Sequence, residues 1–223
     1  MAFKVIEKNI LKASEDTANE NREVLRHNNV FTVNIISSPG AGKTSLIERV
    51  GPVLKEEGVP FTVITGDCFT TRDAERIDVL KIPVIQINTG NACHINGQLI
   101  KAALKDVDLT KMDLLIIENV GNLVCPAQFD LGEDTKIALF SVPEGDDKPV
   151  KYPLIIKQSR LALINKMDLL EHSDFDVSFC EESIKKINPG IETLLISCKK
   201  DEGLDGFISW VKENIKIKKE RNR

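Results

Sequence analysis

Residues 37–44 read Ser-Ser-Pro-Gly-Ala-Gly-Lys-Thr, and they stand between the apolar run 33–36 and a helix-like segment. A strand, a glycine-rich turn and a helix in this order are typical of a phosphate-binding P-loop, whose backbone N–H groups surround the phosphates of a nucleotide. Lys43 would reach the outer phosphates, and Thr44 would ligate Mg²⁺. Ser37 replaces the usual first glycine, so its φ must not need to be strongly positive. The motif predicts nucleotide contacts from Gly40, Ala41, Gly42, Lys43, Thr44 and Ser45.

A second motif selects the base. Residues 165–168 read Asn-Lys-Met-Asp and fit N-K-x-D. The Asp168 carboxylate would accept the N1–H and 2-amino protons of guanine, whereas adenine would leave it unpaired, and such sites discriminate by roughly 10⁴–10⁵-fold. Residues 197–199 match the S-A-K loop whose backbone meets the base carbonyl. Together the two motifs predict GTP, with base-side contacts from Asn165, Lys166, Asp168, Ser197, Cys198 and Lys199.

Carboxylates for a magnesium site follow two predicted strands. Glu118 ends an apolar run, the position of a Walker-B acid that holds Mg²⁺ directly or through water. Residues 119–122 follow where many GTPases carry D-x-x-G, and the N–H of Gly121 can approach the γ-phosphate. Asp67 and Asp73 follow the second predicted strand, and we rank Glu118 above them as a Mg²⁺-associated group. No general base is evident, and phosphoryl transfer depends mostly on positioning and charge stabilisation.

Thiol and imidazole groups lie near the same predicted site. Cys93 and His94 follow the third predicted strand, and Cys125 follows the fourth. The loops after parallel strands share one edge of the sheet, so these groups converge on the nucleotide side. Thiolate with imidazole suits zinc, nickel or copper. Taken singly, each group is more often a buried Cys or a satisfied His, and three ligands leave a tetrahedral site to be completed by water, a partner or a second subunit.

Composition limits the class of protein. The 223 residues are 42% hydrophobic and carry a formal net charge of −4, which does not favour nucleic acid as a partner. We interpret the locally basic segment 212–223 as a solvated helix end. No signal peptide or long apolar stretch is present, so we expect no membrane and a cytoplasmic location. Five irregularly spaced cysteines do not indicate a disulfide framework; we interpret Cys68, Cys180 and Cys198 as core or loop residues.

Apolar runs alternate with amphipathic segments from residue 31 onward, which predicts an α/β fold. We expect a single P-loop G domain over residues 31–223, with a mainly parallel central sheet covered by helices on both faces. An extra N-terminal helix, at 4–27 within residues 1–30, has only a weak apolar stripe of Val5, Ile6, Leu11, Ala13 and Ala18. The predicted strands are 31–37, 60–66, 83–87, 112–118, 136–142, 160–164 and 192–197. The other predicted helices are 43–56, 71–80, 94–105, 150–158, 176–187 and 204–218.

This combination resembles the HypB family, the GTPases that assist nickel insertion into NiFe-hydrogenase. The resemblance covers the chain from the P-loop to the last strand, and its motifs are residues 37–44, 66–67, 88–90, 93–94, 118–126, 129–132, 144–147 and 165–168. It implies a GTP-dependent homodimer with a deviant-Walker-type G domain, acting with hydrogenase maturation proteins and the hydrogenase large subunit. It also implies a nickel or zinc site near the subunit interface at Cys93, His94 and Cys125. The Mg²⁺-linked acids would be Asp73 and Glu118, which with Lys43 and Thr44 form the expected catalytic set.

One departure from the family pattern concerns the N-terminus. Many relatives carry an extra nickel site there, whereas residues 1–30 contain no cysteine and one histidine, His27. We therefore expect nickel handling to rest on the G domain or on a partner. Three alternatives stay open. A urease accessory GTPase would place its ligands in a C-P-H run, a P-loop small-molecule kinase would need a basic lid, and a non-catalytic zinc-binding protein would not turn over GTP.

Overall fold

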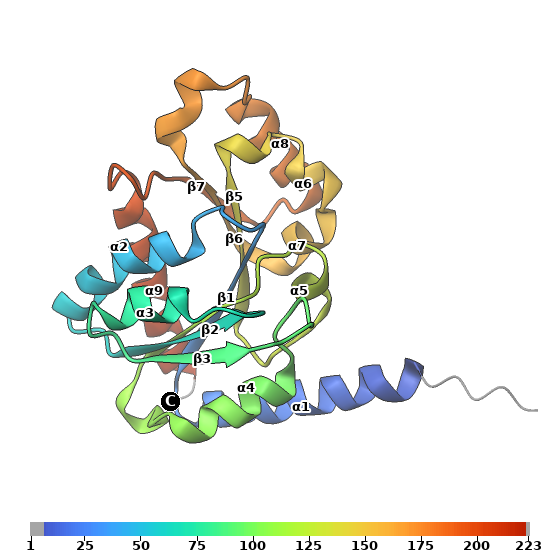
Figure 1. The fold of residues 1–223 in the computed structure, drawn as a ribbon, viewed down its shortest axis with the longest axis vertical. Coiled ribbons are helices and arrows are strands. Elements are labelled where there is room, and N and C mark those ends of the chain that lie inside the picture. Colours follow the sequence, from blue (N-terminus) through green and yellow to red (C-terminus); the bar gives the residue numbers. More distant parts are fainter. Residues whose placement is uncertain (1–6, 222–223) are drawn as a thin grey trace, which may run out of the picture.

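A 7-stranded sheet forms the centre of the computed structural model, which describes residues 7–221, with side chains from Ser14 onward (Figure 1). All neighbouring strands are parallel, and their order is β3-β2-β4-β1-β5-β6-β7. The predicted parallel α/β sheet is confirmed. The strands are β1 (Phe31–Ser37), β2 (Phe61–Asp67), β3 (Val84–Asn88), β4 (Leu114–Glu118), β5 (Thr135–Ser141), β6 (Ser159–Asn165) and β7 (Glu192–Leu195).

Helices and short helical turns connect the strands. The α-helices are α1 (Glu7–His27), α2 (Lys43–Glu56), α3 (Arg72–Asp78), α4 (Gly97–Ala103), α5 (Cys125–Gln128), α6 (Lys148–Lys151), α7 (Pro153–Gln158), α8 (Val177–Ile187) and α9 (Leu204–Arg221). The 3-10 turns are η1 (Leu104–Asp106), η2 (Leu109–Lys111), η3 (Val142–Glu144) and η4 (Met167–His172). Among the residues described, none of the helices has both the length and the hydropathy that crossing a membrane requires.

Both faces of the sheet are covered, which is why every residue of β1, β4 and β5 is buried. On one face, α2, α3 and α9 pack against alternate strand residues such as Val33 and Ile116. On the other face, α1 and α4 cover the β2–β4 side, where Ile117 lies in the same cluster as Ile100. Helices α7 and α8 cover the β5–β6 side of that face around Phe140. The carboxyl ends of all strands therefore form one open edge.

Two predicted helices differ from the structure. The predicted helix 150–158 is divided into α6 and α7 at Tyr152, because the ring of Pro153 disfavours helical backbone at the residue before it. The predicted helix 94–105 begins only at Gly97, so Cys93 and His94 lie in the turn before it. Asn96 accepts a hydrogen bond from Leu99 N and caps this later start.

Helix α1 packs beside α4, while its first turns extend past the body of the domain (Figure 1). Its contact stripe is Thr17, Ala18, Asn21 and Leu25, all buried, with Asn21 three to four residues from each of the others. Of the predicted stripe, only Ala18 has a described side chain; Val5, Ile6, Leu11 and Ala13 lie outside the described side chains. The division into an N-terminal helix (1–30) and a GTPase domain (31–223) stays a prediction.

Candidate nucleotide and metal site

The P-loop connects the central strand β1 to α2, and its glycines supply the backbone that the turn needs. Ser37 is the last residue of β1 and its φ is not positive, so a side chain is tolerated where the motif has glycine. Gly40 has φ 75° and Gly42 has φ 108°, a region that favours glycine. A Cβ at Gly42 would also lie 2.4 Å from Asn165 Nδ2. Lys43 Nζ donates to Ser37 Oγ at 3.0 Å, which holds the ammonium over the loop.

A cavity of about 440 Å³ opens beside this loop. The carboxyl ends of β1, β2 and β4 meet there because these three strands are neighbours in the sheet. Predicted site residues from all three strand ends line this cavity, namely Gly40, Gly42, Lys43, Thr44, Ser45, Asp67, Asp73, Glu118 and Gly121. Ala41 does not line it; its carbonyl faces Asn165 instead.

Glu118 is the most deeply buried acid in this cavity, with 3% of its surface exposed. Thr44 Oγ1 donates to its Oε1 at 2.7 Å, whereas Oε2 has no hydrogen-bond partner among the described residues. Burial raises the pKa of Glu118 to about 7, although the Lys43 ammonium and the Thr44 hydroxyl oppose the shift. Burial also lowers the pKa of Lys43. Burial therefore disfavours the charged forms of both Glu118 and Lys43 more than their partners favour them.

The other two acids are closer to solvent. Asp67 accepts the backbone N–H of Phe69 at 2.8 Å and of Thr70 at 2.9 Å. Partial burial pushes the pKa of Asp67 up, but these backbone hydrogen bonds outweigh it and the net pKa is lowered. Asp73 lies 3.4 Å from Arg76, whose guanidinium also forms a two-pronged pair with Glu48 at 2.6 and 2.8 Å. This pair connects α3 to α2 beside the cavity.

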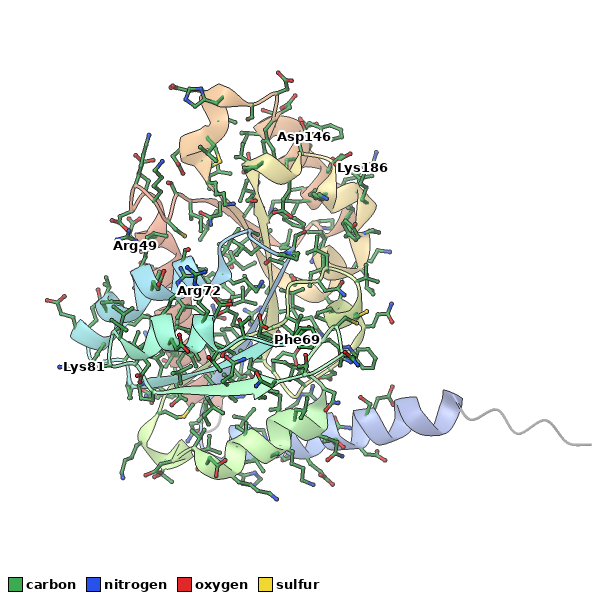
Figure 2. All side chains as sticks on the ribbon, in the orientation of Figure 1. Arg49, Phe69, Arg72, Lys81, Asp146 and Lys186 are labelled. Atoms are coloured by element: carbon green, nitrogen blue, oxygen red, sulfur yellow. The ribbon has the colours of Figure 1, made fainter. Side chains whose placement is uncertain are left out.

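A second cavity of about 450 Å³ continues from the first, since Gly40, Gly42 and Ser45 line both. Its other lining residues include the predicted base-side residues Asn165, Lys166, Asp168, Cys198 and Lys199, together with Glu48, Arg49 and Leu169. Arg49, which lies in the middle of α2, is labelled in Figure 2. Ser197 is buried and does not line the cavity, but its hydroxyl donates to Asp168 Oδ1 at 2.7 Å.

Asn165 connects the three loops around this second cavity. Its Nδ2 donates to the carbonyl of Ala41 at 2.9 Å, and its Oδ1 accepts from Lys166 N at 2.8 Å and from Cys198 N at 3.2 Å. Lys166, with φ 64°, donates from Nζ to Gly40 O at 2.6 Å. The 165–168 and 197–199 loops are therefore attached to the P-loop by hydrogen bonds.

Cys93, His94 and Cys125 come together at the same edge of the sheet, with their ligand atoms within 4.8 Å of one another. Cys125 is the first residue of α5, and Cys93 Sγ lies 3.8 Å from His94 Nδ1. Hydrogen bonding with Cys125, together with burial, raises the pKa of Cys93. Burial lowers the pKa of His94, which favours the neutral imidazole that ligates metals. The described residues contain no other such group of three.

Several residues at the site were not predicted from the sequence. Arg76 lines the phosphate-side cavity within the segment 70–76 that also supplies Asp73. Phe129 stacks on the His94 ring, with centroids 4.1 Å apart and planes 10° apart; its only sequence signal is its place in the 129–132 motif. Cys68 also lines the phosphate-side cavity. The other two thiols, Cys180 and Cys198, are buried, and this burial raises the pKa of Cys180 to about 12 and the pKa of Cys198 to about 11.

The parallel sheet, the P-loop and the joined cavities define a P-loop nucleotide-binding domain. The family described as CobW/HypB/UreG, nucleotide-binding domain, matches residues 31–194. Hydrogenase maturation factor HypB of Azotobacter vinelandii is 45% identical over 206 residues, which are 92% of this chain and 68% of that protein. The probable hydrogenase maturation factor HypB of Methanocaldococcus jannaschii is 40% identical over 211 residues, covering 95% of each.

A solved structure agrees with these relatives. The crystal structure of HypB from Helicobacter pylori in complex with nickel has a TM-score of 0.87 and 37% sequence identity, and the match covers 95% of this chain and 97% of that one. The chain belongs to the HypB family of hydrogenase maturation factors. The resemblance read from the motifs is therefore confirmed, and the urease accessory and kinase alternatives are not favoured.

Proposed function

We propose that this protein hydrolyses GTP and couples that cycle to the delivery of nickel during NiFe-hydrogenase maturation. The observation that carries the proposal is the position of the Cys93–His94–Cys125 cluster, on the sheet edge that holds the P-loop. Cys125 lies seven residues after Glu118, the last residue of β4. A change in the bound phosphates can therefore move Cys125 through this short stretch of backbone. The nickel complex of Helicobacter pylori HypB supports nickel as the cargo; zinc is the alternative that the same ligands accept.

Guanine is the base that fits Asp168. Its carboxylate lines the base-side cavity, and Ser197 occupies only Oδ1, while the nearest cation to Oδ2 is Lys199 Nζ at 3.9 Å. The carboxylate can therefore accept both guanine donors, and adenine would leave this acceptor unmatched. Lys166, extended along the loop toward Gly40, would lie against the base.

The donor set around Glu118 fits Mg²⁺. Oε2 is buried without a partner among the described residues, and Thr44, Asp67 and Asp73 add further oxygens around the same cavity. Mg²⁺ prefers such oxygen ligands. We assign Thr44 and Glu118 as the residues that would hold the ion, with Asp67 and Asp73 around it. When bound, the ion would neutralise charge on the β- and γ-phosphate oxygens.

The remaining chemistry is done by the P-loop and the β4–α5 loop. Lys43 would leave Ser37 Oγ to pair with the outer phosphates. Gly121, which lines the phosphate-side cavity, would offer its N–H to the γ-phosphate. A Cβ at this position would lie 2.9 Å from Pro39 Cα, so the close approach of the two loops requires glycine there. We further propose that the protein acts in the cytoplasm as a GTP-dependent homodimer, with hydrogenase maturation proteins and the hydrogenase large subunit as partners.

Metal titration in different nucleotide states tests this function. Nickel and zinc affinities would be measured for the free, GDP-bound and GTP-analogue-bound protein, with an ATP analogue as the matched control. We expect affinities that differ between the GDP and GTP-analogue states by about 5–150-fold, the usual range of coupling between two sites, and no effect of the ATP analogue. Equal metal affinities in all nucleotide states would mean that the metal site is not coupled to the nucleotide site, and the proposed delivery mechanism would be wrong.

A further inference from the structure

Two chain segments build the metal cluster, and helix α1 contacts both of them. The first segment, residues 93–98, runs from the cluster into α4, and the second, residues 125–132, runs through α5 to the turn before β5. The two segments leave the sheet from different strands and are not continuous with each other. The distance between these two segments therefore depends on packing within the cluster and on contacts with other elements.

Asn21 of α1 provides such a connection. Its Nδ2 donates to Gly97 O and to Leu131 O, each at 2.9 Å, and the residue is 1% exposed. One side-chain amide has two N–H donors in a fixed geometry. The two carbonyls, 34 residues apart in sequence, are therefore held at one separation. Gly97 lies three residues after His94, and Leu131 lies two residues after Phe129, which stacks on the His94 ring.

Further contacts attach α1 to each segment. Arg22 pairs with Asp130 at 2.5 Å, and the backbone at Gly132 approaches α1 so closely that a Cβ would lie 2.7 Å from Ala18 O. On the other segment, Gln98 Nε2 donates to Thr17 Oγ1 at 2.6 Å. None of the α1 side chains that the structure describes, from Ser14 to His27, lines either part of the nucleotide cavity. These contacts therefore act on the metal side of the site.

We propose that α1 sets the geometry of the Cys/His cluster, with Asn21 as its positioning residue; this rests on the proposed metal-binding function. The three ligand atoms lie within 4.8 Å of one another. Bonds of about 2.0–2.3 Å to one ion place tetrahedral ligand atoms about 3.5–3.8 Å apart. Relative shifts of about 1 Å between the two segments therefore decide whether all three ligands reach one ion. Loss of partners that hydrogen-bond the ligands themselves typically costs about 10–100-fold in metal affinity, and we expect a loss in this range when the separation of the two segments is no longer fixed.

The variant Asn21→Leu tests the proposal, because leucine has nearly the same size and donates no hydrogen bond. In the full chain, a Ni²⁺ titration would follow the thiolate-to-nickel absorption band, and Zn²⁺ affinity would be measured from the loss of that band in competition with Ni²⁺. We expect a loss of about 10–100-fold in affinity and a changed band, with unchanged affinity for a fluorescent GTP analogue. Asn188→Leu is the matched control, since Asn188 Nδ2 also donates to two carbonyls, Ile156 O and Ser159 O, outside both segments.

Arg22→Ala carries the test should Asn21→Leu fail to fold, because the Arg22–Asp130 pair is part-exposed and its removal leaves the core intact. About a tenfold loss of nickel affinity with unchanged thermal stability would support the proposal. If Asn21→Leu folds and keeps the wild-type metal affinity and absorption band, the positioning role of α1 is wrong. If only Arg22→Ala folds, the same result in that variant overturns the proposal. Absence of Ni²⁺ and Zn²⁺ binding in the wild type would instead overturn the proposed function.

Discussion

At the scale of single residues, Glu118 combines deep burial with one unpaired oxygen, and this makes its ionisation depend on the surroundings. Its pKa of about 7 in the folded protein lies above the ordinary value of 4.5. A raised carboxyl pKa means that the folded state holds its proton more tightly than the unfolded chain. Its contribution to stability is therefore fully present below pH 4.5 and is lost as the pH rises through about 7.

This linkage gives a prediction for Glu118→Gln in buffer without divalent cations. Glutamine keeps the shape and does not ionise, so the variant should gain stability relative to the wild type between pH 5 and pH 8, on the order of 1–3 kcal/mol. Denaturant unfolding at both pH values measures the difference. Glu182→Gln, which changes an exposed carboxylate on α8, is the control and should show no such trend. A pH-independent difference for Glu118→Gln would show that Glu118 keeps an ordinary pKa.

At the scale of elements, the loop between β4 and α5 connects the phosphate side of the site to the metal side. Asn119, directly after Glu118, is buried and accepts from Ile95 N at 3.1 Å, one residue after His94. Its Nδ2 donates to Asn34 Oδ1 on β1 at 3.2 Å. Ile95 in turn packs against Gly66, where a Cβ would lie 2.6 Å from it. The 93–95 turn is therefore attached to the ends of two strands that line the phosphate-side cavity.

We predict that Asn119→Ala weakens communication between the nucleotide and the metal more than it weakens either binding event alone. The ratio of nickel affinities in the GDP and GTP-analogue states should move toward one, because the turn that carries Cys93 and His94 loses its attachment to β4. Isothermal titration in both states measures this ratio. Asn91→Ala, an exposed asparagine in the same turn, should keep the wild-type ratio. An unchanged ratio in Asn119→Ala would assign the coupling to the Cys125 end of the loop.

At the scale of the whole molecule, the open edge of the sheet presents apolar side chains beside both sites. Phe69, two residues after Asp67, is 78% exposed, and Val124, directly before Cys125, is also exposed (Phe69 is labelled in Figure 2). Large contiguous apolar patches mark binding surfaces, and we interpret Phe69 and Val124 as parts of such a surface. Each chain offers three metal ligands, so two chains that meet at this edge would together offer six.

We therefore predict that the GTP-analogue and nickel-bound protein doubles its mass in light scattering, and that Phe69→Ser weakens this association about tenfold or more. The serine removes apolar area that the contact would bury. Val79→Ser is the matched control, since Val79 is 79% exposed and lines neither part of the nucleotide cavity. A monomer mass in every nucleotide and metal state would contradict the homodimer.

Much of the architecture follows from local sequence signals. Each predicted strand from residue 31 onward ends within two residues of the observed one, because a short apolar run between turns has few alternatives in a sheet buried on both faces. The P-loop and the 165–168 motif could be assigned because their chemistry depends on consecutive residues. The meeting of Cys93 and His94 with Cys125 also followed from the sequence, since parallel strands direct their following loops to one edge.

Tertiary structure alone decided what holds these groups in position. The Asn21 amide joins carbonyls at residues 97 and 131, Asn119 reaches Ile95, and Phe129 stacks on His94. Backbone carbonyls and N–H groups occur at nearly every residue, so the sequence carries no mark of which one a distant side chain will bind. Residue types and spacing therefore predicted which side chains gather at the site. Its supports depend on contacts between segments up to 126 residues apart, which only the packed chain defines.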